Sequence, residues 1–479
     1  MCQATRASLI VMPQAIQDFD PVYSFFKPLV VYTARCHYNS VTIRGREHLP
    51  IEGGYILAPC HQQALMEPLA ILAVTRRPTV FLARADVFNN NAVRAFLTFL
   101  KILPVYRIRD GKESLSKNAD IFRRSEQVLL DGKPLCLMAE GRHNNKHQLL
   151  PLVKGMFRIA GEAQRQMGNT PLYIVPVGID FDEYEQPFAN MVVDIGEPVA
   201  VQPFMEAYIE NEPVALNRMR EAVALAMHRQ MYDIRSTHHY DDIHTLCNVL
   251  IPDALRCSHL RRTPWNRFLM RRRLANHFDV LELSGGQEAE QLFSDAREFR
   301  QQCQSLHVSE KTVAVPWPAW CTVLSVLVVL GVVAACVLMP WVRWIVLFCV
   351  LCFPWPLLPT ALIPHRFVSD TQFRSSVDYG LRFFLGILYT IVIAIVAGCT
   401  GGFWLGQHVP DLGGLWWALI AFDLPLLLLP IEGKLFTWLR LTWQHLSLLM
   451  RRIFAPRATK KLFALRDRLL QAIPQDATL

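Results

Sequence analysis

Short apolar runs alternate with longer segments of helical periodicity along residues 41–201. The short runs predict strands buried on both faces, and the longer segments predict helices that each bury one stripe. The expected strands are Ser40–Arg44, Gly54–Ala58, Thr79–Ala83, Pro134–Met138, Tyr173–Ile179 and Met191–Ile195. The expected helices between them are Pro68–Thr75, Asn91–Lys101, Ser114–Asp131 and Gly155–Gln166. This alternation predicts an α/β domain with a mixed, largely parallel sheet flanked by helices.

Residues 316–437 are apolar almost throughout and predict a C-terminal helical transmembrane domain. Four stretches approach the ~20 residues that cross a hydrocarbon core. They are about Ala319–Met339, Trp341–Ile363, Phe383–Thr400 and Leu412–Leu429. Arginines follow the second stretch, Lys and Arg follow the fourth, and neither follows the third. The positive-inside tendency therefore predicts that both termini and the α/β domain are cytoplasmic, and we expect a bacterial inner membrane.

Three further segments complete the expected organisation. Residues 1–40 include an aromatic and aliphatic stretch that is too short to span a bilayer; an interfacial helical anchor and a helix packed on the α/β domain are both compatible with it. Residues 202–315 are charged and predict a helical cytoplasmic region. Residues 438–479 form a basic amphipathic tail that could lie on the inner leaflet.

The overall charge narrows the classes of partner. The 479 residues carry a formal net charge of +8, which favours anionic lipid headgroups or acidic substrates. The Lys and Arg residues are dispersed and no recognition motif accompanies them, so nucleic acid is not expected as a partner. The 12 cysteines show no zinc-like spacing and predict free thiols in a reducing compartment, and no metal is expected.

The segment HQQALMEP, His61–Pro68, carries the first candidate chemistry. It follows an apolar run that predicts a buried strand, and it places His61 close to the carboxylate of Glu67. An imidazole whose second ring nitrogen is held by a carboxylate is a common general base near neutral pH. Cys60, directly before His61, is the alternative as a covalent nucleophile, although no local base accompanies it.

Other candidate residues also lie in or after expected strands or apolar runs. In open α/β sheets, functional residues gather beyond the carboxyl ends of the strands. The candidates in addition to His61 and Glu67 are Arg84, Arg107, Arg109, Glu140, Gly141, Arg142 and Pro176. We interpret His143 and His147 as surface polar residues.

These blocks, in this order, resemble the 1-acylglycerol-3-phosphate acyltransferase family, the PlsC-like lysophospholipid acyltransferases. That family has a His-x4-Asp motif, an arginine block, a Pro-Glu-Gly block and an apolar block centred on proline. The resemblance covers about residues 40–200 and has two departures. The acid is Glu67, one position later than the family aspartate, and Ala139 replaces the proline before Glu140.

The resemblance implies a membrane-bound O-acyltransferase of phospholipid biosynthesis. His61 would be the general base and Glu67 its partner, while Arg107, followed by Arg109, Arg142 and Arg84, would bind the acceptor phosphate. Glu140 would bind acceptor hydroxyls or order the arginines, and Gly141 would allow close backbone approach.

The expected reaction moves a fatty acyl group from acyl-CoA or acyl-carrier protein to 1-acylglycerol-3-phosphate, giving phosphatidic acid without a cofactor. Another lyso-lipid acceptor and a non-catalytic, lipid-binding membrane protein are the alternatives.

Overall fold

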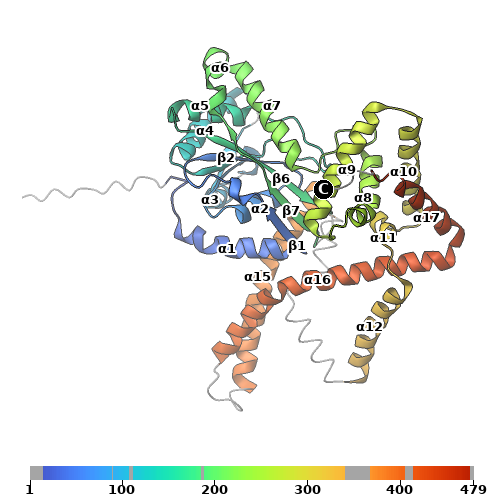
Figure 1. Ribbon diagram of the computed structural model, residues 1–479. Helices are drawn as coiled ribbons and strands as arrows, with labels where there is room; N and C mark the ends of the chain where they lie inside the picture. The colour runs from blue at the N-terminus through green and yellow to red at the C-terminus, as the bar shows by residue number, and fades with distance from the viewer. Residues whose placement is uncertain are drawn as a thin grey trace, which may run out of the picture.

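The computed structural model describes residues 15–88, 90–106, 112–184, 188–339, 367–404 and 414–474. An eight-stranded sheet forms the centre of the N-terminal domain, in the order β1-β7-β6-β2-β5-β3-β4, with β8 paired to β6 (Figure 1). The strands are β1 (Ser40–Arg44), β2 (Tyr55–Pro59), β3 (Val80–Arg84), β4 (Ile102–Val105), β5 (Pro134–Cys136), β6 (Tyr173–Phe181), β7 (Asn190–Ile195) and β8 (Val199–Ala200). All six expected strands are present, and the mixed, largely parallel sheet is confirmed.

Strand direction decides which residues can meet. The strands β6, β2, β5, β3 and β4 are mutually parallel, whereas β7 is antiparallel to β6 and β1 is parallel to β7. The carboxyl ends of the five parallel strands therefore share one edge of the sheet. The segments that follow β2, β3 and β5, which carry most of the described candidate residues, all emerge at this edge.

Helices cover both faces of the sheet. The expected helices are present as α2 (Met66–Val74), α3 (Asn91–Phe99), α4 (Lys112–Leu130) and α5 (Lys154–Met167). The short helix α6 (Met205–Glu210) and the longer α7 (Glu212–Gln230) also belong to this domain. Apolar residues of α7 are buried in the same core as those of the sheet, so this core extends beyond residue 201.

The N-terminal helix α1 (Pro21–Cys36) has two different apolar surfaces. Tyr23 and Ala34 are buried, while Phe25 and Phe26 are exposed. One surface of the helix therefore packs on the α/β domain while aromatic side chains remain open to the surroundings.

A second core forms among the charged helices that follow. It contains α8 (Tyr240–Cys257), α9 (Pro264–Ser284), α10 (Gln287–Ser305) and α11 (Glu310–Ala314), together with α17 (Pro456–Leu470) of the tail. Leu462, Leu465 and Leu469 of α17 are buried in this core. The apolar face of this part of the tail is therefore covered by protein and is not available to the inner leaflet.

Among the described residues, two helices are long and apolar enough to cross a membrane. They are α12 (Ala319–Leu338) and the segment Phe373–Val396 of α15 (Thr371–Trp404). They contain the first expected span and most of the third. The second expected span lies outside the described residues. Most of the fourth lies at the beginning of α16 (Gly414–Phe454), where most side chains are not described.

The helices α12 and α15 both project from one side of the protein. Figure 1 shows α12 and the outer part of α15 projecting from the same side of the molecule, along which α1 also runs. Most large apolar side chains of α12 are exposed, and Thr322 is the residue buried within it. This arrangement fits helices whose apolar surfaces are covered by lipid.

Candidate active site

The loop between β2 and α2 carries His61 and is closed by the side chain of Glu67. The Glu67 side chain is fully buried in the first turn of α2. Its Oε1 accepts the backbone N–H groups of Gln62 at 2.8 Å and of Gln63 at 2.5 Å. A carboxylate in this position satisfies unpaired loop donors and is stabilised by the positive end of the helix dipole.

The second oxygen of Glu67 faces His61. Glu67 Oε2 lies 3.4 Å from His61 Nδ1, and the His61 side chain is only 11% exposed. Neither atom has a hydrogen-bond partner among the described residues, so the two groups face each other at ion-pair distance. The longer glutamate side chain thus spans the additional residue between the imidazole and the acid.

The other ring nitrogen of His61 faces His143. The two atoms, His61 Nε2 and His143 Nδ1, are 2.9 Å apart, and the rings meet edge to face with their centroids 4.6 Å apart. Burial, and then the proximity of His61, lowers the pKa of His143 to about 4. A neutral His143 can donate its Nδ1–H to His61 while His61 donates its own Nδ1–H toward Glu67. The interpretation of His143 as a surface residue is therefore wrong.

Glu140 fixes the backbone around His61. Beyond β5, the backbone N–H groups of Leu137 and Ala139 donate to β2 carbonyl groups, which brings Glu140 beside the His61 loop. Glu140 Oε1 then accepts the His61 N–H at 3.0 Å, and Oε2 accepts the Leu150 N–H at 3.1 Å. Burial raises the pKa of Glu140 to about 8, although these two donors act in the opposite direction. The Glu140 carboxyl group therefore joins two loops at the site.

Gly141 is needed for a conformational reason. Its φ is +64°, and an added Cβ would lie 2.6 Å from a methyl carbon of Val153. Residues with a side chain rarely adopt this backbone conformation. Gly141 therefore allows the chain to turn directly after Glu140.

The remaining candidate site residues do not all lie at the His61 site. Arg84 hydrogen-bonds to Asp86, and Arg142 is exposed beside His143. Arg84 lies near enough for its charge to contribute to the low pKa of His143. Pro176 is buried within β6 beside Ala58 of β2, so it belongs to the interior of the sheet. Arg107 and Arg109 lie outside the described residues.

Cys60 has a structural role. Its side chain is fully buried, and its Sγ lies 3.2 Å from the N–H of Ile179 on the neighbouring strand. Burial raises the pKa of the Cys60 thiol well above its ordinary value. Because the thiolate is the nucleophilic form, this position disfavours covalent catalysis by Cys60.

His147 is also buried rather than at the surface. Its Nδ1 lies 2.8 Å from the hydroxyl group of Tyr184 and 3.2 Å from Asp180 Oδ1. Asp180 in turn pairs with Arg271 of α9 at 3.4 Å. His147 therefore belongs to the polar network that connects the loop after β5 to α9.

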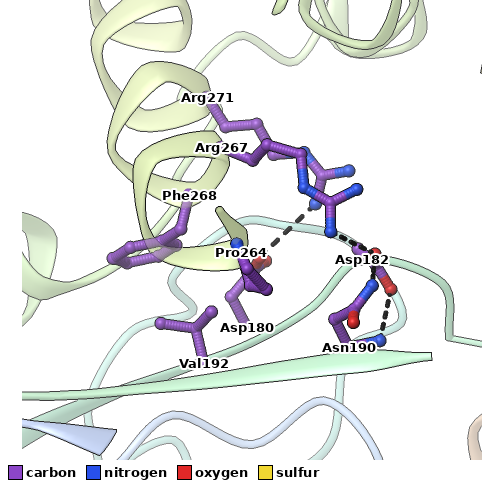
Figure 2. Close-up of a pocket in the computed structure, with 8 residues that line it drawn as sticks. All are labelled: Asp180, Asp182, Asn190, Val192, Pro264, Arg267, Phe268 and Arg271. Carbon is purple, nitrogen blue, oxygen red and sulfur yellow. Dashed lines mark hydrogen bonds and ion pairs between the residues drawn. The ribbon is translucent and has the colours of Figure 1, made fainter. Parts of the chain in front are cut away.

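A pocket lies beside this network, between α9 and the sheet (Figure 2). Figure 2 shows Arg271 directed toward Asp180 and Arg267 directed toward Asp182. Since both guanidinium groups already have carboxylate partners, this pocket is an ion-paired contact between the two parts of the protein and does not present free positive charge.

Part of the chain is similar to known proteins. Residues 40–180 match the family model described as Acyltransferase. Among solved structures, the chain is similar to the crystal structure of the 1-acyl-sn-glycerophosphate acyltransferase PlsC from Thermotoga maritima. The identity is 16% and the TM-score 0.33, and the match covers 44% of this chain and 80% of that chain. No curated protein sequence matches. Residues 40–180 therefore resemble the Acyltransferase family.

Proposed function

We propose that this protein is a membrane-bound O-acyltransferase that acylates a lysophospholipid, and that its acceptor is 1-acylglycerol-3-phosphate. The observation that carries the proposal is the His61 ring, held between the buried carboxylate of Glu67 and His143 at the carboxyl edge of the sheet. The product would be phosphatidic acid, and the acyl donor would be acyl-CoA or acyl-carrier protein. The catalytic domain and both termini would lie on the cytoplasmic side of a bacterial inner membrane.

The proposed reaction is direct transfer. His61 Nε2 removes the proton of the acceptor hydroxyl while the hydroxyl oxygen attacks the thioester carbonyl carbon. A new C–O ester bond forms, the C–S bond breaks, and the departing thiolate takes up the proton from the His61 imidazolium. Glu67 keeps the His61 proton on Nδ1 and stabilises the imidazolium that forms during transfer.

His143 occupies the place that the acceptor hydroxyl requires. His61 Nε2 lies 2.9 Å from His143 Nδ1. When His61 carries its proton on Nδ1, as the mechanism requires, the one lone pair of Nε2 faces His143. The acceptor hydroxyl must therefore displace His143 before it can react. This makes His143 a competitor for the base and not a member of the proton-transfer path.

Removal of the base tests the mechanism. We expect His61→Ala to reduce acyl transfer by about 10²- to 10⁴-fold, which is the usual contribution of general base catalysis. Glu67→Gln should cause a smaller loss, of about 10- to 100-fold, or roughly 1.4–2.8 kcal/mol in the activation free energy. The measurement is acyl transfer by the purified full-length protein in lipid nanodiscs, with several lyso-lipid acceptors and both types of donor.

The matched control is His48→Ala. His48 also faces a carboxylate, with its Nε2 3.1 Å from Glu197, but it follows β1 and lies at the opposite edge of the sheet. Near-normal transfer by His61→Ala would contradict the mechanism. Transfer to none of the acceptors by the unmodified protein, together with retained lipid binding, would instead favour a non-catalytic lipid-binding protein.

Arg107→Ala tests recognition of the phosphate. We expect it to raise the KM for 1-acylglycerol-3-phosphate about tenfold or more, because a hydrogen bond to a charged group contributes about 1.5–3 kcal/mol. The KM for a monoacylglycerol, which has no phosphate, should hardly change. Arg123→Ala on α4 is the control, since Arg123 is 75% exposed and paired with Asp120. An equal rise in the KM for both acceptors would exclude Arg107 as the phosphate ligand.

His143→Ala separates competition from proton transfer. If the acceptor displaces His143, this variant should lower the acceptor KM about fivefold, since one hydrogen bond contributes about 1 kcal/mol. We expect kcat to stay within about threefold of the unmodified protein, as measured by steady-state kinetics. A fall in kcat similar to that of His61→Ala would show that His143 carries the proton.

A further inference from the structure

The first turns of α15 lie directly against the catalytic loop. The segment Phe373–Val396 of this helix is long and apolar enough to cross a membrane, and its beginning contacts the residues around His61. We propose that Ser376 on α15 is a positioning residue for His61, so that the membrane-entering helix completes the active site. This inference rests on the proposed acyltransferase function.

Ser376 makes two hydrogen bonds to the loop backbone. The Leu65 N–H donates to Ser376 Oγ at 3.0 Å, and Ser376 Oγ donates to the Gln63 carbonyl oxygen at 3.2 Å. The Ser376 residue is buried, so water competes little for either bond. One hydroxyl group on α15 thus holds both sides of the turn that connects His61 to Glu67.

The turn that Ser376 holds has an unfavourable backbone conformation. Ala64 lies between the two bonded residues and has a φ of +43°. A residue with a Cβ adopts this left-handed region only where its surroundings impose it. The two Ser376 hydrogen bonds flank Ala64, and they help to impose the conformation that keeps the Gln62 and Gln63 N–H groups directed at Glu67.

A second contact connects α15 to the other loop of the site. The ring of Phe373 packs edge to face on the His143 ring, with the centroids 5.0 Å apart. The Asn145 side-chain amide donates to Thr371 Oγ1 at 3.3 Å. The beginning of α15 therefore contacts both loops that carry ring nitrogens of the site.

The same part of α15 is also attached to α1. Ser375 Oγ lies 3.3 Å from His37 Nε2, and the Tyr379 hydroxyl lies 3.0 Å from Thr33 Oγ1. These contacts face a different element from those of Ser376. Ser375 is thus a neighbouring serine on the same helix turn whose hydroxyl does not contact the catalytic loop.

The position of Ser376 has a consequence for the substrate. Farther along α15, Phe384, Leu388 and Val392 are exposed, as expected for a surface covered by lipid acyl chains. His61 is therefore held close to the point where α15 enters its apolar segment. A lysophospholipid could present its hydroxyl group to His61 while its acyl chain remains in the bilayer beside this helix.

Steady-state kinetics test the proposal. The variants Ser376→Ala and Ser375→Ala are compared in the full-length protein in nanodiscs. We expect Ser376→Ala to lower kcat about tenfold with less than a twofold change in acceptor KM, because small displacements of a catalytic group are costly. Ser376→Thr keeps the hydroxyl group and should recover most of the loss. Equal kcat values for Ser376→Ala and Ser375→Ala would overturn the proposal.

Hydrogen–deuterium exchange gives a readout that needs no turnover. The Leu65 amide should exchange about tenfold faster in Ser376→Ala than in Ser375→Ala, since only the first variant removes its acceptor. If the unmodified protein transfers no acyl group, the proposed function fails, while faster Leu65 exchange would still support the contact. An unchanged exchange rate would overturn the contact itself.

Discussion

The buried carboxylate of Glu67 is the interaction on which the rest of the site depends. One oxygen accepts two backbone N–H groups of the preceding loop, and the other faces the His61 ring. A buried polar group without partners costs about 1–3 kcal/mol, so both the loop and the carboxylate would be destabilised without each other. The loop conformation and the orientation of the imidazole therefore have a common cause. A substitution at Glu67 alters both together.

Other elements act on this loop from outside. Glu140 accepts the His61 N–H from one side, and Ser376 of the apolar helix α15 bonds to the loop backbone from another. The contact from α15 is the one that a soluble acyltransferase domain alone could not provide. It offers a physical reason for a C-terminal apolar region in this chain, since the first turns of α15 contact both loops of the site. The apolar helices would then position the reaction at the bilayer surface as well as anchor the protein.

The hydrophobic pattern predicted most of the sheet, because strands that are buried on both faces read as continuous apolar runs. It did not identify β4, an edge strand of four residues that contains Pro104, a residue that weakens the expectation of a strand. His61 and Glu67 could be proposed from their types and order. His143 could have been noticed because it follows Glu140 at a strand end. Ser376 had no local signal, since it contacts Leu65 from 311 residues away along the chain. The burial of Leu465 could not be predicted from the sequence either, because a basic amphipathic helix can pack on protein or on lipid.

In the proposed mechanism, Glu67 holds His61 with its proton on Nδ1 and its Nε2 lone pair directed at the acceptor. The most direct test is the ¹⁵N NMR spectrum of the imidazole in protein labelled at histidine, with His61 assigned by the signal that His61→Gln removes. At neutral pH we expect the Nδ1–H tautomer for His61, and a shift away from this tautomer in Glu67→Gln. A His61 ring protonated on Nε2 in the unmodified protein, or a tautomer that does not respond to Glu67→Gln, would contradict this mechanism.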